Sequence, residues 1–148
     1  MTTENNTAVD EAQIRECMDK QAKAVRAKDL RGALAAYAPN VLSFDVVNPL
    51  QNVGVEAVRV RLEAWFSQFR GPIGCENRDL SITAGADAGF CHSLNRVSGT
   101  RTGCEKLEMW WRATVCFRKI DNQWMITHEH ASVPFDGNSG LASLNLKP

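Results

Sequence analysis

The chain has 148 residues, and its 17 lysine and arginine residues balance its 17 aspartate and glutamate residues. A chain of this length is expected to fold as one domain with a sizeable core. The balance lacks the basic excess that is typical of nucleic-acid-binding proteins, so we expect no nucleic acid partner. No run of about 18 apolar residues occurs, so we expect no membrane-spanning segment.

The first residues of the chain and its cysteines indicate where in the cell the protein is expected. Residues 1–9 are polar and lack periodicity, and we interpret them as a disordered tail before a single domain at 10–148. The same stretch has no apolar core of a secretory signal. The 5 cysteines are scattered and include no CxxC pair, which favours reduced thiols and a cytoplasmic location.

Helical periodicity dominates the first half of the chain. Apolar residues recur at helical spacing over 10–28, and a second short helix follows the capping residue Asp29 and ends at Pro39. The β-branched and aromatic run at 41–47 predicts a strand. The clearest helical period then spans 55–69 and stops at the Gly-Pro pair that follows it.

From there the pattern changes to period two. We predict strands at roughly 76–85, 88–98, 106–119 and 123–134, with turns between them. Helices followed by a run of antiparallel strands predict an α+β fold, in which helices cover one face of a curved sheet.

One predicted strand, LEMWWRATVCF, is apolar on both faces. Trp110, Arg112, Thr114 and Cys116 alternate with Met109, Trp111, Ala113, Val115 and Phe117. Helices would cover one face, and a second subunit would cover the other, since large exposed apolar patches are unusual in soluble monomers. The strand therefore predicts a homodimer.

The order of elements resembles the nuclear transport factor 2-like superfamily, which includes ketosteroid isomerase and the SnoaL-like proteins. The resemblance lies in KDLRGALAAYAPNVLSFDVV, VGVEAVRVRLEAWFSQF and WWRATVCFRKIDNQWMITHEHASVPFD, and is closest to the SnoaL-like branch. It implies a cone of strongly curved, antiparallel or mixed sheet with about three helices on the concave side. It also implies a pocket between sheet and helices, and dimerisation through the outer sheet face.

The isomerase site carries over only in part. By resemblance, Asp45 matches the catalytic carboxylate, whereas Gln21 replaces the tyrosine that binds the oxyanion. Arg112 falls at the second oxyanion-binding position. The base is therefore retained and the oxyanion hole is not, and an arginine there suits a carboxylate, phosphate or enolate better than a neutral ketone. Arg112 would pair either with Asp45 or with an anionic ligand.

Two of the 3 histidines stand close together in ITHEHASVPF. By strict alternation His128, His130 and Ser132 share a face, which the resemblance makes a wall of the pocket, and Glu129 points to the outer or dimer face. One imidazole would relay protons or orient a substrate oxygen. The alternatives are buried polar residues satisfied by their neighbours, or metal ligation.

Further candidates line the same predicted pocket. Trp110 and Thr114 share the face of Arg112, Trp65 lies on the third helix, and His92 lies in a strand for which either face fits. We interpret these as substrate-binding residues. A metal would need ligands beyond the two neighbouring histidines, such as Asp45 or His92, and no HExxH, CxxC pair or carboxylate cluster supports one. We therefore expect no metal and no cofactor.

Three functions compete. The first is cofactor-independent proton transfer on a small, partly apolar carbonyl or anionic compound, as in an isomerase, cyclase, dehydratase or hydrolase. Asp45 would be its base, a histidine its acid and Arg112 its anion stabiliser. The second is a non-catalytic ligand-binding or dimeric association module. The third is a metal-dependent hydrolase or oxygenase built on the two neighbouring histidines.

Overall fold

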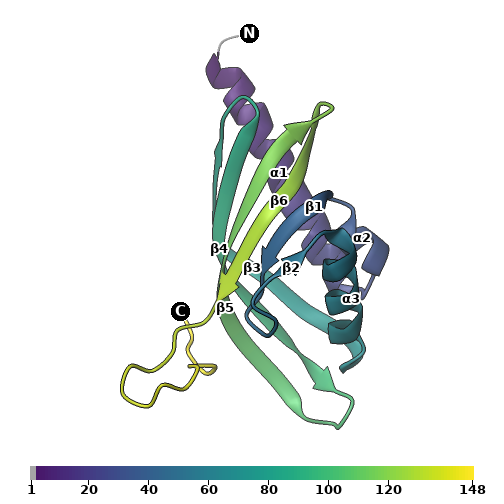
Figure 1. The fold of residues 1–148 in the computed structure, drawn as a ribbon, viewed down its shortest axis with the longest axis vertical. Coiled ribbons are helices and arrows are strands. Elements are labelled where there is room, and N and C mark those ends of the chain that lie inside the picture. The colour runs from purple at the N-terminus through teal and green to yellow at the C-terminus, as the bar shows by residue number, and fades with distance from the viewer. Residues whose placement is uncertain (1–2) are drawn as a thin grey trace.

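The structure, a computed structural model, describes residues 3–148, with side chains from residue 6 onward. Three helices and six strands follow one another along this part of the chain (Figure 1). The helices are α1 (Thr3–Arg26), α2 (Leu30–Leu34) and α3 (Val55–Phe66). The strands are β1 (Tyr37–Phe44), β2 (Asn52–Val53), β3 (Phe69–Ala84), β4 (Ala88–Arg101), β5 (Lys106–Ile120) and β6 (Gln123–Ser132).

All six strands form one sheet, in the order β2-β1-β6-β5-β4-β3. Neighbouring strands are antiparallel except β1 and β6, which are parallel. The long strands β3, β4 and β5 bend strongly along their length (Figure 1). The predicted α+β architecture, with a curved mixed sheet, is therefore confirmed.

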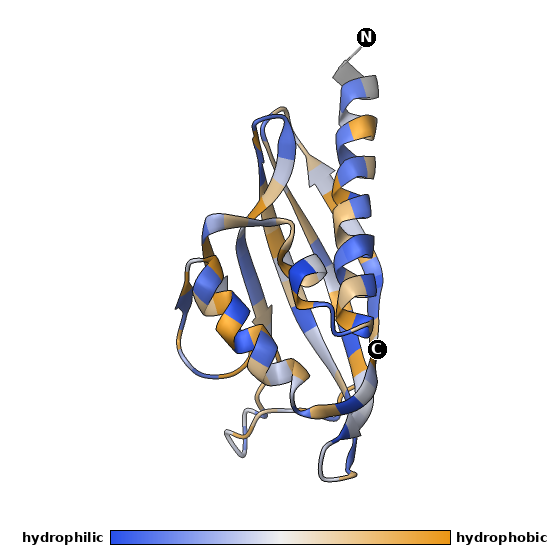
Figure 2. Ribbon diagram, turned by 90° about the vertical axis from the view of Figure 1, so that its right-hand side faces the viewer, coloured by the Kyte–Doolittle hydropathy of each residue, from blue (hydrophilic) through white to orange (hydrophobic). Residues whose placement is uncertain are grey.

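The helices lie on one side of this sheet (Figure 2). Ile14 and Met18 of α1 pack with Val115 and Phe117 of β5 in one core cluster. A second cluster, formed around Phe66 of α3, includes β4 and β5 residues nearer the other end of the sheet. We call the helix-covered side of the sheet the inner face and the opposite side the outer face.

The first helix begins earlier than predicted. It starts at Thr3, so the expectation of a disordered tail over 1–9 is wrong for 3–9, while residues 1–2 lie outside the described part. Within this helix the buried carboxylate of Asp10 accepts hydrogen bonds from Lys119 Nζ at 2.7 Å and Trp124 Nε1 at 3.2 Å. No helix in the described chain is long and apolar enough to cross a membrane.

The strand that follows α3 also begins earlier than predicted. β3 starts at Phe69 rather than near residue 76 and runs through the Gly71-Pro72 pair that we expected to separate helix from strand. Proline is tolerated there because β3 is an edge strand, and its register with β4 shifts between Arg70 and Gly74. Phe69 and Ile73 are buried, so the strand is held on the inner face.

A β-bulge in β6 decides which of its side chains face the helices. Phe117 pairs with Ile126, and the next residue, Cys116, pairs with His128, so Thr127 is an extra residue. Ile126 is buried on the inner face with Phe117. After the bulge the alternation is reversed, and the following residues on the inner face are odd-numbered.

Candidate functional site

Glu129 is the carboxylate that β6 presents on the inner face. Its Oε2 accepts a hydrogen bond of 2.6 Å from the Tyr37 hydroxyl, and its Oε1 accepts one of 2.9 Å from the Ser43 hydroxyl. Both donors lie on β1, and Ser43 is the direct neighbour of Glu129 across the parallel pairing. Two adjacent strands thus bring three polar side chains together beneath the helices.

The surroundings change the acidity of this pair. Burial raises the pKa of Glu129, and the negative charge of Asp45 adds to the rise, against the opposing effect of the hydrogen bonds from Tyr37 and Ser43. Burial also raises the pKa of Tyr37 well above its usual value, with a further contribution from the charge of Glu129. The pair therefore favours a neutral phenol and a carboxyl that keeps its proton to higher pH than an exposed glutamate.

Asp45 lies at the edge of this group, directly after β1 ends. Its Oδ1 accepts the Val46 backbone N–H at 2.6 Å, and its Oδ2 lies 3.0 Å from Nε of Arg61 on α3. The Arg61 N–H is not directed at that oxygen, so the contact is an ion pair without a hydrogen bond, and this buried Nε has no hydrogen-bond partner among the described residues. The side chains of Asp45 and Arg61 are 23% and 25% exposed, which places the pair at the rim of the site.

The inner face beside Glu129 carries small and polar residues. Ser93, Ala113 and Ala131 are direct neighbours across β4, β5 and β6. Ser93 is buried and donates a 2.7 Å hydrogen bond to the side-chain carbonyl of Asn95, which is also buried. This strip leaves less side-chain volume between sheet and helices than the apolar rows on either side.

Gln21 and Trp65 lie on the helices that cover this face. The side-chain Nε2 of Gln21 donates to the Ala33 carbonyl oxygen at 3.4 Å, and the side chain lies close enough to Tyr37 to oppose the rise in the pKa of that phenol. Trp65 packs edge-on against Phe69, with ring centroids 5.3 Å apart, at the margin of the second core cluster. Of the residues proposed from the sequence, the structure therefore brings Asp45 and Gln21 towards Glu129 and keeps Trp65 on the helix-covered side.

The histidines lie on the opposite face from the one predicted. His128 and His130 pair with Cys116 and Thr114, on the outer face, while Glu129 occupies the inner face. The predictions that the histidines line the inner pocket and that Glu129 points outward are therefore wrong in placement. The cause is the extra residue Thr127, which reverses the alternation that the sequence suggested.

Contacts on the outer face confirm this placement. The ring of Phe44 meets both imidazoles edge-on, at centroid distances of 4.8 Å for His128 and 5.4 Å for His130. His128 Nδ1 lies 2.8 Å from the Leu42 carbonyl oxygen, so this nitrogen carries the proton in the neutral ring.

The remaining predicted pocket residues share the outer face. Arg112 donates from Nε to the Ser132 hydroxyl at 3.2 Å and does not pair with Asp45, which Arg61 takes instead. Trp110 lies under the Arg78 guanidinium, 5.9 Å from the ring centroid. His92 and Thr114 are exposed neighbours on β4 and β5. These residues do not line the inner face, because Val115 and Phe117 alternate with them and pack against α1.

Sequence reasoning missed Glu129 as an inner residue, and with it Tyr37 and Ser43. Ser43 and Asp45 lay within the predicted strand 41–47, whereas the prediction that the second helix ends at Pro39 placed Tyr37 in that helix. This was wrong, because α2 ends at Leu34 and β1 begins at Tyr37. Neither hydroxyl could be matched to an acceptor before the β1–β6 pairing was known. Among residues 3–148 no group of three or more histidine, cysteine, aspartate or glutamate side chains is arranged to hold a metal.

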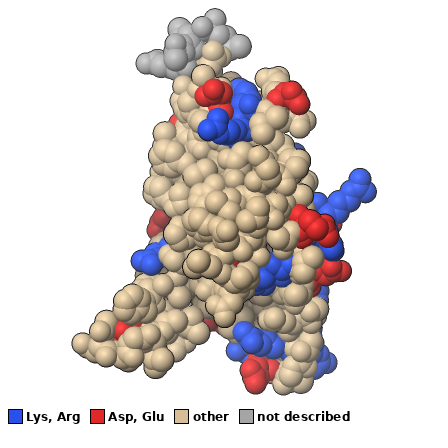
Figure 3. All heavy atoms as spheres, in the orientation of Figure 1, with Lys and Arg blue, Asp and Glu red and all other residues tan. Residues whose placement is uncertain are grey.

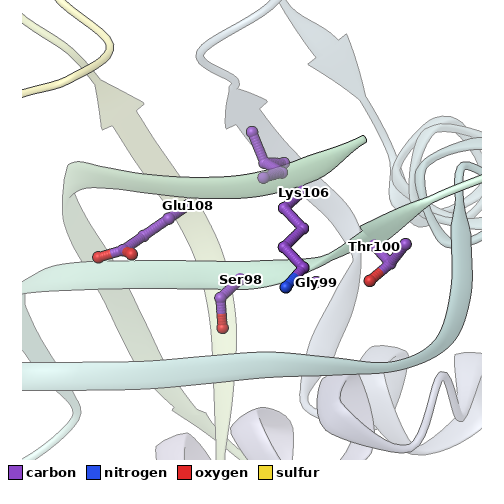
Figure 4. Close-up of a pocket in the computed structure, with 6 residues that line it drawn as sticks. Ser98, Gly99, Thr100, Lys106 and Glu108 are labelled. Carbon is purple, nitrogen blue, oxygen red and sulfur yellow. The ribbon is translucent and has the colours of Figure 1, made fainter. Parts of the chain in front are cut away.

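Two surface hollows lie away from these residues. A hollow of about 300 Å³ is lined by Ser98, Gly99, Thr100, Lys106, Leu107 and Glu108, on the hairpin that joins β4 and β5 (Figure 4). A second, of about 220 Å³, lies between Trp110 and the last residues of the chain. Lys106 and Glu108 are exposed, so the first hollow is a surface feature and not the interior space expected from the resemblance.

Comparison with known proteins now decides the family. The family model described as a SnoaL-like domain matches residues 14–136. The chain belongs to the SnoaL-like domain family. None of the curated protein sequences matches the chain.

Solved structures support the assignment of the SnoaL-like domain. An NTF2-like protein of unknown function from Pseudomonas putida KT2440 is 33% identical, with a TM-score of 0.88 over 96% of this chain and 99% of the other. An NTF2-like superfamily protein from Salmonella enterica serovar Typhimurium is 13% identical, with a TM-score of 0.78 over 92% and 99%. A ketosteroid isomerase-like protein from Erwinia carotovora atroseptica is 16% identical, with a TM-score of 0.70 over 82% and 94%. The NTF2-like fold implied by the resemblance is confirmed.

Proposed function

We propose that this SnoaL-like domain binds a small, partly apolar carbonyl compound against the inner face and catalyses proton transfer on it without a cofactor. The observation that carries the proposal is the largely buried Glu129 carboxyl, hydrogen-bonded to Tyr37 and close to a second carboxylate, Asp45. Two carboxyl groups with different surroundings are suited to opposite roles in acid–base chemistry.

Asp45 is the base in this mechanism. It lies at the rim of the site, where its side chain is 23% exposed and its Oδ2 is 3.0 Å from Nε of Arg61. Asp45 removes a proton from the carbon next to the carbonyl group, and the electron pair moves onto the carbonyl oxygen as an enolate. The proton returns from Asp45 to a different carbon, which completes an isomerisation.

Glu129 supports the developing enolate. In its protonated form it donates one O–H to the substrate oxygen, and its other oxygen still accepts from Tyr37. The Tyr37 hydrogen bond polarises the carboxyl group and strengthens this donation. Glu129 and Tyr37 thus replace the oxyanion-binding residues that the resemblance placed at Gln21 and Arg112.

The test is solvent exchange at carbon. Wild-type protein in D₂O is incubated with a panel of small cyclic β,γ-unsaturated ketones, and deuterium incorporation and isomerisation are followed by proton NMR. We expect Asp45→Asn and Glu129→Gln each to lower the rate about 10²- to 10⁴-fold, while the exposed Glu63→Gln on α3 leaves it unchanged. If His130→Ala abolishes exchange and Glu129→Gln does not, the outer face holds the active residues and the proposal fails.

A second candidate is ligand binding without turnover. It is favoured by the hydrogen bonds from Tyr37 and Ser43, which occupy both carboxylate oxygens of Glu129. The carboxylate therefore needs no substrate to satisfy its hydrogen bonding. Broadening of ketone signals on addition of protein, with no deuterium incorporated, would support this candidate over catalysis. We also propose a cytoplasmic location, because all five cysteines are free thiols.

A further inference from the structure

The last residues of the chain form an arm that leaves the sheet. After β6 ends at Ser132, residues 133–148, here called the C-terminal arm, project away from the strands (Figure 1). A bridge between Phe135 and Ala142 and a 2.8 Å hydrogen bond from the Asp136 N–H to the Leu141 carbonyl close a hairpin within it. The arm therefore holds its shape through its own backbone contacts.

This arm exposes large apolar side chains. They are Phe135 (70% exposed), Leu141 (70%), Leu144 (47%) and Leu146 (55%). A contiguous segment with such exposure is unusual in a soluble protein unless another surface covers it.

The base of the arm is fixed against its own chain. Leu144 and Leu146 line the 220 Å³ hollow with Trp110 of β5, and Lys147 Nζ lies 3.8 Å from Glu108 Oε1. Because these contacts are on the outer face, the hairpin projects beside that face and not towards the helices.

Part of the outer face is exposed and carries little charge. Figure 3 shows a broad area without lysine, arginine, aspartate or glutamate on this side of the molecule. The strand pairings place Phe44, Leu94 and Cys116 on this face, all partly exposed, together with the three histidines. The charged side chains on the same face include Arg112, which is hydrogen-bonded to Ser132, Arg78, which lies over Trp110, and the ion pair of Arg96 with Glu108.

We propose that the C-terminal arm binds the outer sheet face of a second copy of this chain, so that two chains exchange arms. Between residues 133 and 146 the only ionisable side chain is Asp136, and its carboxylate is occupied by the backbone N–H groups of Asn138 and Ser139. A segment without free charge does not select a strongly acidic or basic partner, whereas its apolar side chains match Phe44, Leu94 and Cys116 of the outer face.

Symmetry favours the same occupant. The arm and the outer face lie on one side of the chain, so a two-fold axis places each arm on the other chain's face and covers both apolar surfaces at once. The exchanged arms add contacts of their own to those that the two outer sheet faces would make with each other. It is independent of whether the inner face carries out proton transfer.

Sedimentation velocity of the full chain tests the proposal. At about 1 to 100 µM, a range that resolves micromolar dissociation constants, we expect wild-type protein to sediment at twice the chain mass of 16.4 kDa. The Phe135→Asp/Leu141→Asp double variant should dissociate at least about tenfold more readily. Leu50→Asp is the matched control, because Leu50 is 95% exposed in the loop between β1 and β2 and should leave the mass unchanged.

A crosslinking experiment identifies the contact directly and does not depend on a destabilising charge. A benzophenone amino acid is placed at position 141, and the labelled chain is mixed with ¹⁵N-labelled chain before irradiation. We expect crosslinks from position 141 to residues 42–44, 114–116 or 128–130 of the other isotope. A wild-type protein of single-chain mass, a double variant that associates as tightly as wild type, or crosslinks confined to one chain would each overturn the proposal.

Discussion

The hydroxyl of Tyr37 donates a 2.6 Å hydrogen bond to Glu129 across the parallel pair of strands β1 and β6. These two residues are 92 positions apart in the sequence. The charge and hydrogen bond of Glu129 raise the pKa of Tyr37, whereas the hydrogen bond from Tyr37 opposes the rise that burial causes in the pKa of Glu129. Their coupling gives the inner face a protonation behaviour that can be measured without knowing the substrate.

Tyr37 is the only tyrosine of the chain, so its ionisation can be read directly from the ultraviolet absorbance of tyrosinate. Burial and the charge of Glu129 raise its pKa well above the usual value of 10.0. We expect the native protein to show no tyrosinate until alkaline unfolding begins, whereas protein in denaturant titrates near the usual value. Native titration near pH 10 would contradict the buried hydrogen bond.

Glu129 should make stability depend on pH. Because its folded-state pKa is raised above 4.5, the folded chain holds this proton more tightly than the unfolded chain. The contribution to the free energy of unfolding is complete at acid pH and is lost as pH rises from 4.5 through the raised pKa. Urea unfolding at several pH values should therefore show Glu129→Gln gaining stability relative to wild type as pH rises.

The same series includes Glu63→Gln on the exposed face of α3, which should follow the wild-type curve apart from a small constant offset. A difference between wild type and Glu129→Gln that stays constant with pH would show that Glu129 has an ordinary pKa.

Asp10 anchors α1 to the ends of β5 and β6. Its carboxylate accepts hydrogen bonds from Lys119 and Trp124, so Asp10→Ala leaves a buried indole N–H and a lysine without their acceptor. We expect a loss of about 1 to 3 kcal/mol in the free energy of unfolding. Asp19→Ala, at an exposed position on the same helix, should change it by less than about 0.5 kcal/mol. Equal effects would contradict the anchoring role.

Two phenylalanines on adjacent strands test the assignment of the faces. Phe117 is 1% exposed on the inner face, and Phe90 is 44% exposed on the outer face. Phe117→Ala should lower the free energy of unfolding by about 3 to 5 kcal/mol, because it leaves a cavity in the core. Phe90→Ala should cost far less in the single chain. A larger loss of stability for Phe90→Ala than for Phe117→Ala in dilute, monomeric protein would show that the inner and outer faces are assigned the wrong way round.

The fold was predictable because its periodicities are long and unambiguous. The helix after Gly54 and the alternating strands 88–101 and 106–120 needed only local patterns, and the resemblance supplied their arrangement. Local patterns also misled, since Gly71-Pro72 normally ends a strand or helix but is tolerated on the edge strand β3. Whether a proline interrupts a strand depends on what lies beside it, which the sequence does not state.

The candidate site was predictable only in part. Asp45 was found because the resemblance matches it to the catalytic carboxylate of the isomerase, but the residues of β6 were assigned to the wrong faces. A single bulge at Thr127 moves His128 and His130 outward and Glu129 inward, and bulges leave no dependable local signal. The pattern of β5 could not correct this assignment, because both of its faces are apolar and either could have been the one that the helices cover.

The parallel pairing of β1 with β6 also has a consequence for biosynthesis. β1 emerges from the ribosome long before β6, yet its inner-face residue Val41 shares a core cluster with Trp124 and Ile126 of that last strand. Until β6 is translated, no strand joins β1 and β2 to β3, β4 and β5 in one sheet. The nascent chain therefore depends on remaining unaggregated until β6 has been synthesised.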